Sequence, residues 1–75
     1  MIDNKFLKVG QRFMGNVNGA KFKIIDITRG LKGNAQQSPT QQKTIYIYTE
    51  DENGREFSTN LENFKRLQIT PTKGD

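Results

Sequence analysis

The sequence predicts an all-β domain in which five antiparallel strands form one strongly bent sheet that closes into a small barrel, with one short helical turn before the last strand. Three observations support this prediction. With 75 residues the chain has room for one domain, expected to span residues 1–75. Short runs alternate apolar and polar residues, which is typical of half-buried strands. Asn-Gly pairs at residues 18–19 and 53–54 separate such runs and indicate hairpins.

The strand expected over residues 21–28 changes phase near its middle. Phe22 and Ile24 share one face, whereas Ile25 and Ile27 fall on the other face if the strand is regular. A bulge at Ile24–Ile25 would return all four side chains to one core, and such bends allow small barrels to close. The alternative is a strand buried on both faces, for which the chain is poor in apolar residues. The remaining strands are expected near Arg12–Gly15, at 44–50, at 55–59 and around Leu67–Ile69.

Side-chain parity sets the loop length of the second hairpin. A three-residue loop at 52–54 places Phe57 opposite Thr49, on the same face as Ile47. A two-residue loop would instead move Phe57 to the face of the tyrosines. The longer loop is typical of a type I turn followed by a left-handed residue, a conformation that Gly54 adopts at little cost.

The end of the chain predicts one helical turn and a short strand. Residues 59–62 have capping-box form, with Thr59 followed three residues later by Glu62. The final strand is expected to stop at Pro71, and residues 71–75 are expected to form a frayed tail.

The longest interruption is the polar segment 30–42, which contains two glycines and one proline. A stretch of this length between adjacent strands is generally functional or disordered. The composition predicts a flexible loop without secondary structure, mobile over residues 33–41 in the free protein.

The bulge and the three-residue hairpin together define an expected core. Every member is apolar and falls on the inner face of a strand or of the helical turn. The expected core residues are Phe13, Phe22, Ile24, Ile25, Ile27, Ile45, Ile47, Phe57, Leu61, Phe64, Leu67 and Ile69.

The composition argues against an enzyme. The chain has no His and no Cys, which excludes a zinc site built on these ligands, a Cys or His nucleophile and a disulfide framework. The clustered carboxylates are expected around an exposed hairpin tip, which is typical of a solvated turn. Those residues are Glu50, Asp51, Glu52 and Glu56, and they lack the spacing of a calcium loop. We therefore expect no catalytic residue, no metal and no cofactor.

Charge and aromatic residues predict a binding surface. Residues 5–43 hold eight basic residues and one acid, Asp26. Tyr46 and Tyr48 point to one side of their strand, which parity assigns to solvent. Exposed aromatic rings in a positive field resemble a platform for stacked bases. The alternative is that the rings lie over the outer sheet as cross-strand partners of Asp26, Ser58 or Asn60. The candidate binding residues are Lys21, Lys23, Arg29, Lys43, Tyr46 and Tyr48.

No membrane partner is expected. The first five residues show no apolar run behind a basic cluster, as a signal peptide would have. No stretch approaches the 18 apolar residues of a membrane span. A cytoplasmic protein is the default expectation.

The order of the elements resembles the Src-homology-3-like small barrel, in which a helical turn also precedes the last strand. Several segments are similar in style to short barrel proteins of phages and mobile elements of Gram-positive bacteria, namely residues 8–13, 22–27, 51–57 and 64–67. The resemblance implies a fold and, by itself, no activity. Signalling members bind proline motifs through aromatic residues that include Trp. This chain has no Trp, which argues against that specificity.

Two functions follow as hypotheses. The first is a nucleic-acid-associated accessory protein that binds single strands through the basic and tyrosine residues. The second is an adaptor or inhibitor that binds a host or phage protein through a sheet edge, the tyrosine face or the long loop. Continuous positive charge around the tyrosines would favour the first, and a neutral apolar patch would favour the second.

Overall fold

The computed structural model describes residues 2–33 and 36–73, and in these residues five antiparallel strands form one sheet in the order β4-β3-β2-β1-β5. This arrangement confirms the predicted all-β fold with a single five-stranded sheet. The elements in chain order are the 3-10 helix η1 (Asn4–Phe6), β1 (Arg12–Gly15), β2 (Lys21–Arg29), α1 (Pro39–Lys43), β3 (Ile45–Asp51), β4 (Glu56–Asn60), α2 (Leu61–Lys65) and β5 (Ile69–Thr72).

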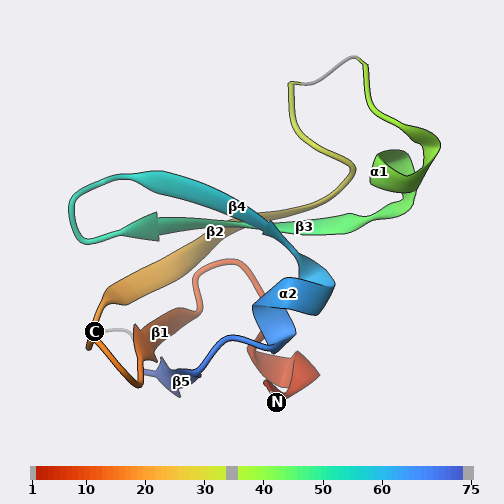
Figure 1. Ribbon diagram of the computed structural model, residues 1–75. Helices are drawn as coiled ribbons and strands as arrows, with labels where there is room; N and C mark the ends of the chain where they lie inside the picture. The colour runs from red at the N-terminus through yellow and green to blue at the C-terminus, as the bar shows by residue number, and fades with distance from the viewer. Residues whose placement is uncertain (1, 34–35, 74–75) are drawn as a thin grey trace.

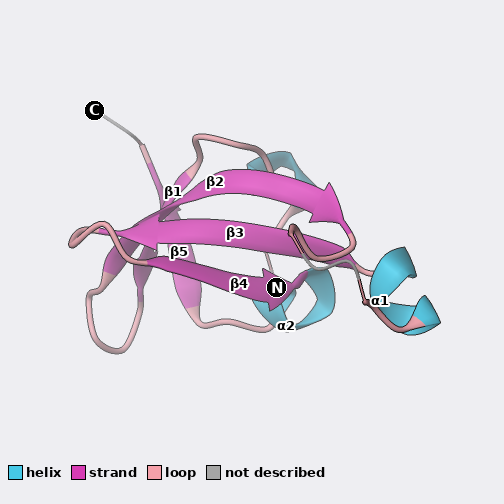
Figure 2. Cartoon of the chain, turned by 90° about the horizontal axis from the view of Figure 1, so that it is seen from above, coloured by secondary structure: helices cyan, strands magenta, loops and turns pink. Residues whose placement is uncertain are grey.

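The long strand β2 joins the two halves of the sheet. Its first residues pair with β1, and almost its whole length pairs with β3. In Figure 1 the β1–β5 half lies below β2, β3 and β4, and Figure 2 shows the last three side by side. Within the described residues β4 and β5 do not pair with each other, so the sheet is bent but open.

The bend coincides with the predicted bulge. The pairing of β2 with β3 shifts between Ile24 and Asp26, which leaves Ile25 as the extra residue. Ile24 is fully buried, and Ile27 packs against the buried core from the other side of the shift. The bulge therefore returns Phe22, Ile24 and Ile27 to one interior, as expected, whereas Ile25, which was expected there too, does not join the buried cluster.

The centre of the core is aromatic. Phe13 and Phe64 are 0% and 1% exposed, and their rings meet edge to face with centroids 5.4 Å apart. Phe22 stacks on Phe13 at 5.7 Å. Ile24 and Ile47 complete the fully buried set. Three further members of the expected core are half-buried against this centre, namely Ile27, Leu61 and Ile69.

Two expected core residues are exposed, and the prediction for them was wrong. Phe57 is 54% and Leu67 is 46% exposed. Phe57 lies opposite Thr49 in the expected register, but its strand β4 is at the edge of the sheet, and no further strand of the described residues covers it from outside. Leu67 follows the end of α2. Ile25 and Ile45, at the bulge and at the start of β3, are only half-buried.

The N-terminal segment also contributes to the core, which was not predicted from the sequence. Ile2 is 8% exposed and belongs to the buried cluster. Phe6 and Leu7, in and after η1, also pack against it. Figure 1 shows η1 close to α2 and β5, at the lower end of the molecule.

The second hairpin has the predicted three-residue loop. Thr49 lies opposite Phe57, and the Asp51 N–H donates to the Arg55 carbonyl at 3.0 Å. Gly54 has φ +79°, the left-handed conformation that the loop requires. The Asp51 carboxylate also accepts from the N–H groups of Asn53 and Arg55, which fixes the turn.

Gly54→Val is expected to lower the free energy of unfolding by about 1 to 2 kcal/mol, because a β-branched residue adopts a positive φ only at a cost. A Cβ at this position meets no atom within 4 Å, so the loss comes from the backbone conformation alone. Urea unfolding followed by circular dichroism measures it. Gly54→Asn should lose less, since Asn tolerates this conformation. Equal stability of Gly54→Val and the wild type would contradict the turn assignment.

The start of α2 and the end of β5 differ from expectation. Asn60, rather than Thr59, is the N-cap of α2, and its side chain accepts from the Asn63 N–H at 2.7 Å. Pro71 lies inside β5 instead of ending it, opposite Phe13. A proline is tolerated there because β5 is an edge strand with one side unpaired. The expected frayed tail therefore cannot begin at residue 71.

The connection between β2 and β3 contains structure that was not expected. α1 covers Pro39–Lys43, with Ser38 as N-cap in a capping box with Gln41. The Gln37 side-chain oxygen accepts a hydrogen bond from the Leu31 N–H at 2.7 Å, and the Gln37 side-chain nitrogen donates one to the Leu31 carbonyl at 3.0 Å. Residues 34–35 of this connection lie outside the described residues. The expectation of a segment without secondary structure was thus wrong, and its mobility stays a prediction.

Candidate functional site

Three basic residues of β1 and β2 share the outer face of the sheet. Directly opposed residues lie on the same face, and Arg12 is opposite Lys23 while Met14 is opposite Lys21. Phe13 and Phe22, between them, point into the core. The alternation of the two strands therefore sets Arg12, Lys21 and Lys23 side by side, toward solvent.

The same cross-strand row continues into acidic residues. Lys23 is opposite Glu50, and Glu50 is opposite Glu56. The row thus carries two cations on β1 and β2 and two carboxylates on β3 and β4. The charge on this face changes sign from one end of the sheet to the other.

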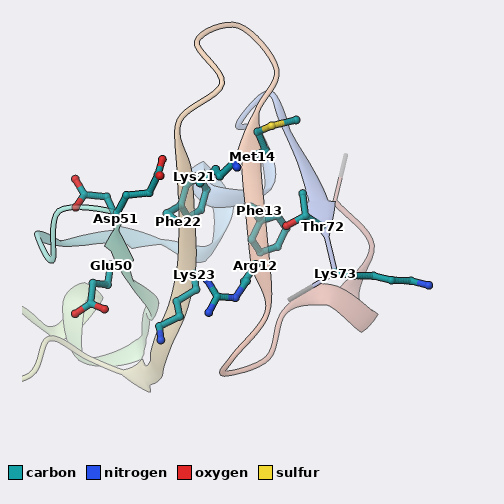
Figure 3. A pocket seen from close by; sticks show the side chains of 11 residues that line it. Arg12, Phe13, Met14, Lys21, Phe22, Lys23, Glu50, Asp51, Thr72 and Lys73 are labelled. Atoms are coloured by element: carbon teal, nitrogen blue, oxygen red, sulfur yellow. The ribbon is translucent and has the colours of Figure 1, made fainter. Parts of the chain in front are cut away.

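A hollow of about 670 Å³ lies at the basic end of this face. Figure 3 shows Arg12 and Lys23 extending to the same side of their strands, with Glu50 beside Lys23 and Lys73 pointing away. Asp51 and Glu52 also line the hollow, so its charge is mixed. Arg12 was not among the predicted binding residues. Its position next to Phe13, a core residue, would have assigned its side chain to the outer face.

Tyr48 is held by the chain itself. Its hydroxyl accepts from the Lys32 main-chain N–H at 2.7 Å, and the Lys32 ammonium lies 5.1 Å from the centre of its ring. Lys32 also forms an ion pair with Asp26, the cross-strand neighbour of Tyr48, at 2.7 Å. A cation of the protein therefore covers the ring on which a base was expected to stack.

The ion pair changes the titration of both of its members. The hydrogen bond from the Lys32 ammonium lowers the pKa of Asp26. The hydrogen bond that the Ile27 N–H donates to the same carboxylate lowers this pKa further. The same hydrogen bond to Asp26 raises the pKa of Lys32. Both shifts favour the charged forms, so the pair stays formed at neutral pH.

Tyr46 is surrounded differently. It lies opposite Thr28 on one side and Asn60 on the other, and it is half-buried. Its direct cross-strand neighbours are uncharged. Tyr46 is therefore the better placed of the two rings for a contact with a partner.

Two of the predicted binding residues lie away from the outer face. Arg29 is opposite Ile45, which shares the inner parity of Ile47, so strand alternation directs it away from the tyrosines. Lys43 lies in the last turn of α1, outside the sheet. The register thus places Lys21 and Lys23 of β2 on the same face as the tyrosines of β3, with Tyr46 towards the far end of β2, and it separates the other two residues from that face.

No family model, no curated protein and no solved structure matches the chain.

In the described part of the chain, no group of three or more His, Cys, Asp and Glu side chains lies close enough together to hold a metal ion. None of the helices there has the length and apolar character needed to cross a membrane.

Proposed function

We propose that the protein is a non-enzymatic binding module that associates weakly with single-stranded nucleic acid. The observation that supports this proposal is the juxtaposition of Arg12, Lys21 and Lys23 on one exposed face of β1 and β2. Guanidinium and ammonium groups that share one face can bind a phosphate together.

The architecture fits the proposal that the fold is a variant of the Src-homology-3-like barrel, in the style of small proteins of phages and mobile elements. Three features support it: the order β4-β3-β2-β1-β5, a long bulged β2 that serves both halves of the sheet, and a short helix before the last strand. Such small β-barrels bind partners on the sheet face and loops. The proposal concerns architecture and assigns no reaction.

The geometry also limits the affinity. Glu50 lies next to Lys23 in the row and repels a phosphate chain that runs towards β3. The proposed path therefore follows β1 and β2, with Tyr46 as the nearest ring that is not already covered by a cation. We expect weak binding with little sequence preference, because nothing on this path presents an array of donors and acceptors to base edges.

Binding of a labelled single-stranded oligonucleotide should weaken steeply with salt. Three phosphate contacts imply a slope of roughly −2 in log affinity against log salt, since each contributes about −0.7 on a single strand. Lys23→Ala or Arg12→Ala should reduce the slope by up to about 0.7. Fluorescence anisotropy over a salt series measures this. Arg29→Ala is the matched control, since it removes the same charge from the other face and should leave the slope unchanged.

Tyrosine variants separate stacking from charge in the same assay. Tyr46→Ala should weaken binding by about 1 to 3 kcal/mol without changing the salt slope, because the ring carries no charge. A slope that responds equally to Arg29→Ala and Lys23→Ala would indicate attraction by net charge alone. Absence of binding at low salt would refute the nucleic-acid proposal.

A protein partner is the second candidate function. One observation favours it: two large exposed apolar side chains, Phe57 and Leu67, line the same hollow between β4, the start of β2 and the end of α2. The mixed charge around Tyr48 points in the same direction.

A further inference from the structure

An apolar hollow of about 380 Å³ lies between β4, the start of β2 and the end of α2. Its apolar lining consists of Ala20, Phe22, Phe57, Phe64 and Leu67. Phe64 is 1% exposed, whereas Phe57 is 54% and Leu67 is 46% exposed. Singly exposed apolar residues are common, but two that share one hollow with buried rings of the core form a patch of the kind found at interaction sites.

The hollow adjoins an edge strand with free main-chain groups. The Asp51 N–H bonds the Arg55 carbonyl, and antiparallel pairs alternate between bonded and non-bonded along the ladder. In the observed register Thr49–Phe57 is therefore a bonded pair, and Glu56 and Ser58 direct their N–H and C=O groups away from β3. β4 has a strand neighbour on one side only and contains no proline. Such an edge is a template for another strand.

The two faces beside this edge differ in chemistry. On the inner face Phe57 lies next to the apolar hollow. On the outer face Glu56 lies directly opposite Glu50. Lys23 lies opposite Glu50 on β2, and Lys32 attracts Glu56 from a distance, but neither carboxylate forms a direct ion pair within the described residues. A pair of directly opposed like charges is unfavourable, and a further cation on the open side of Glu56 would reduce the repulsion.

We propose that β4 accepts an extended segment of a partner protein as an additional strand, and that this segment alternates apolar and basic residues. Its apolar side chains would cover Phe57 and fill the hollow, while its Lys or Arg side chains would lie beside Glu56 and Glu50. Main-chain bonds would come from Glu56 and Ser58. A second copy of this chain fits less well, because β4 itself contains no basic residue. Lys21 lines both this hollow and the hollow on the basic face. The free edge of β4 and the Glu56–Glu50 pair take no part in the proposed nucleic-acid contacts, so variants of β4 test the strand-addition proposal by itself.

The probe is a fluorescently labelled peptide in which lysine alternates with valine, compared with a peptide in which glutamate replaces every lysine. The protein carries a net charge of +4, so general attraction would favour the glutamate peptide. Tighter binding of the lysine peptide, by about tenfold or more, would therefore report the local carboxylates. Glu56→Lys should reverse this preference.

Ser58→Pro tests the strand-addition geometry. The Ser58 N–H points away from β3, so proline removes a donor from the free edge without breaking the β3–β4 ladder. We expect it to weaken binding of the lysine peptide by about tenfold or more, while Ser58→Thr, which keeps the N–H, binds as the wild type does. If Ser58→Pro does not fold, as judged by circular dichroism, a peptide N-methylated on alternate nitrogens removes the same main-chain bonds from the partner's side.

Three outcomes would overturn the proposal. The first is equal binding of the lysine and glutamate peptides, or no binding of either up to about 1 mM. The second is unchanged binding by Ser58→Pro and by the N-methylated peptide. The third is self-association in sedimentation velocity that Ser58→Pro abolishes while no peptide binds, which would assign the edge to a second copy.

Discussion

Phe13→Ala is expected to lower the free energy of unfolding by about 3 to 5 kcal/mol, which is as much as a core of this size generally supplies. Phe13 is fully buried, and its ring contacts the rings of Phe22 and Phe64. The cavity left by the ring cannot collapse easily, because the surrounding residues come from separate strands and from α2. The variant should be largely unfolded in the absence of denaturant.

Urea unfolding by circular dichroism measures this loss, and Phe57→Ala is the matched control. It removes the same ring from a position that is 54% exposed, so it should cost less than about 1 kcal/mol. Similar losses for the two variants would mean that Phe13 does not occupy the centre of the core.

Ile2→Ala is expected to lower the free energy of unfolding by about 2 to 3 kcal/mol. This is a large effect for a residue so near the N-terminus, where chains are usually poorly ordered. The reason is that Ile2 is 8% exposed and belongs to the buried cluster with Phe13 and Phe64.

The control for Ile2 is Val17→Ala, which shortens an apolar side chain that is 83% exposed in the first hairpin loop and should change stability by no more than about 0.5 kcal/mol. A wild-type urea midpoint for Ile2→Ala would show that the N-terminal segment does not contribute to the core in solution.

The features that depend on local parity could be predicted from the sequence. The phase change after Ile24 predicted the bulge, and the position of Phe57 relative to Thr49 predicted the loop that Gly54 closes. Both arguments compare residues within a few positions of each other. The strand geometry then determines the outcome with little influence from the rest of the chain.

The features that depend on contacts between distant residues could not be predicted from the sequence. Parity assigns Phe57 to the inner face correctly, but it does not say whether anything covers an edge strand there. The burial of Ile2 depends on a contact with residues more than ten positions away, for which a single N-terminal isoleucine gives no periodic signal. Helix α1 is only five residues long, and the Ser38-Pro39 start that nucleates it lies in a segment whose composition is that of a loop.

In the candidate site, too, the features set by local parity were predictable and those set by distant contacts were not. Strand alternation placed Lys21, Lys23 and the two tyrosines on one face, as the register confirms. The contact of Lys32 with Tyr48 joins residues 16 positions apart across a long connection, and no spacing rule predicts it. Arg29 was also a candidate binding residue, but beyond the bulge the odd-numbered residues of β2 lie on the inner face, which separates Arg29 from the tyrosines.

The bulge at Ile25 also determines which sequence changes β2 tolerates. Before it, even-numbered positions such as Phe22 and Ile24 must stay apolar, and after it the requirement passes to odd-numbered positions such as Ile27. In a diverging lineage, charged residues should therefore accumulate at odd positions in the first half of the strand and at even positions in the second. A deletion of one residue anywhere in β2 would erase that offset and send either the aromatic half or the isoleucine half of the strand to the solvent. Homologues of this protein should consequently vary in the length of the loops on either side of β2 and keep the length of the strand itself.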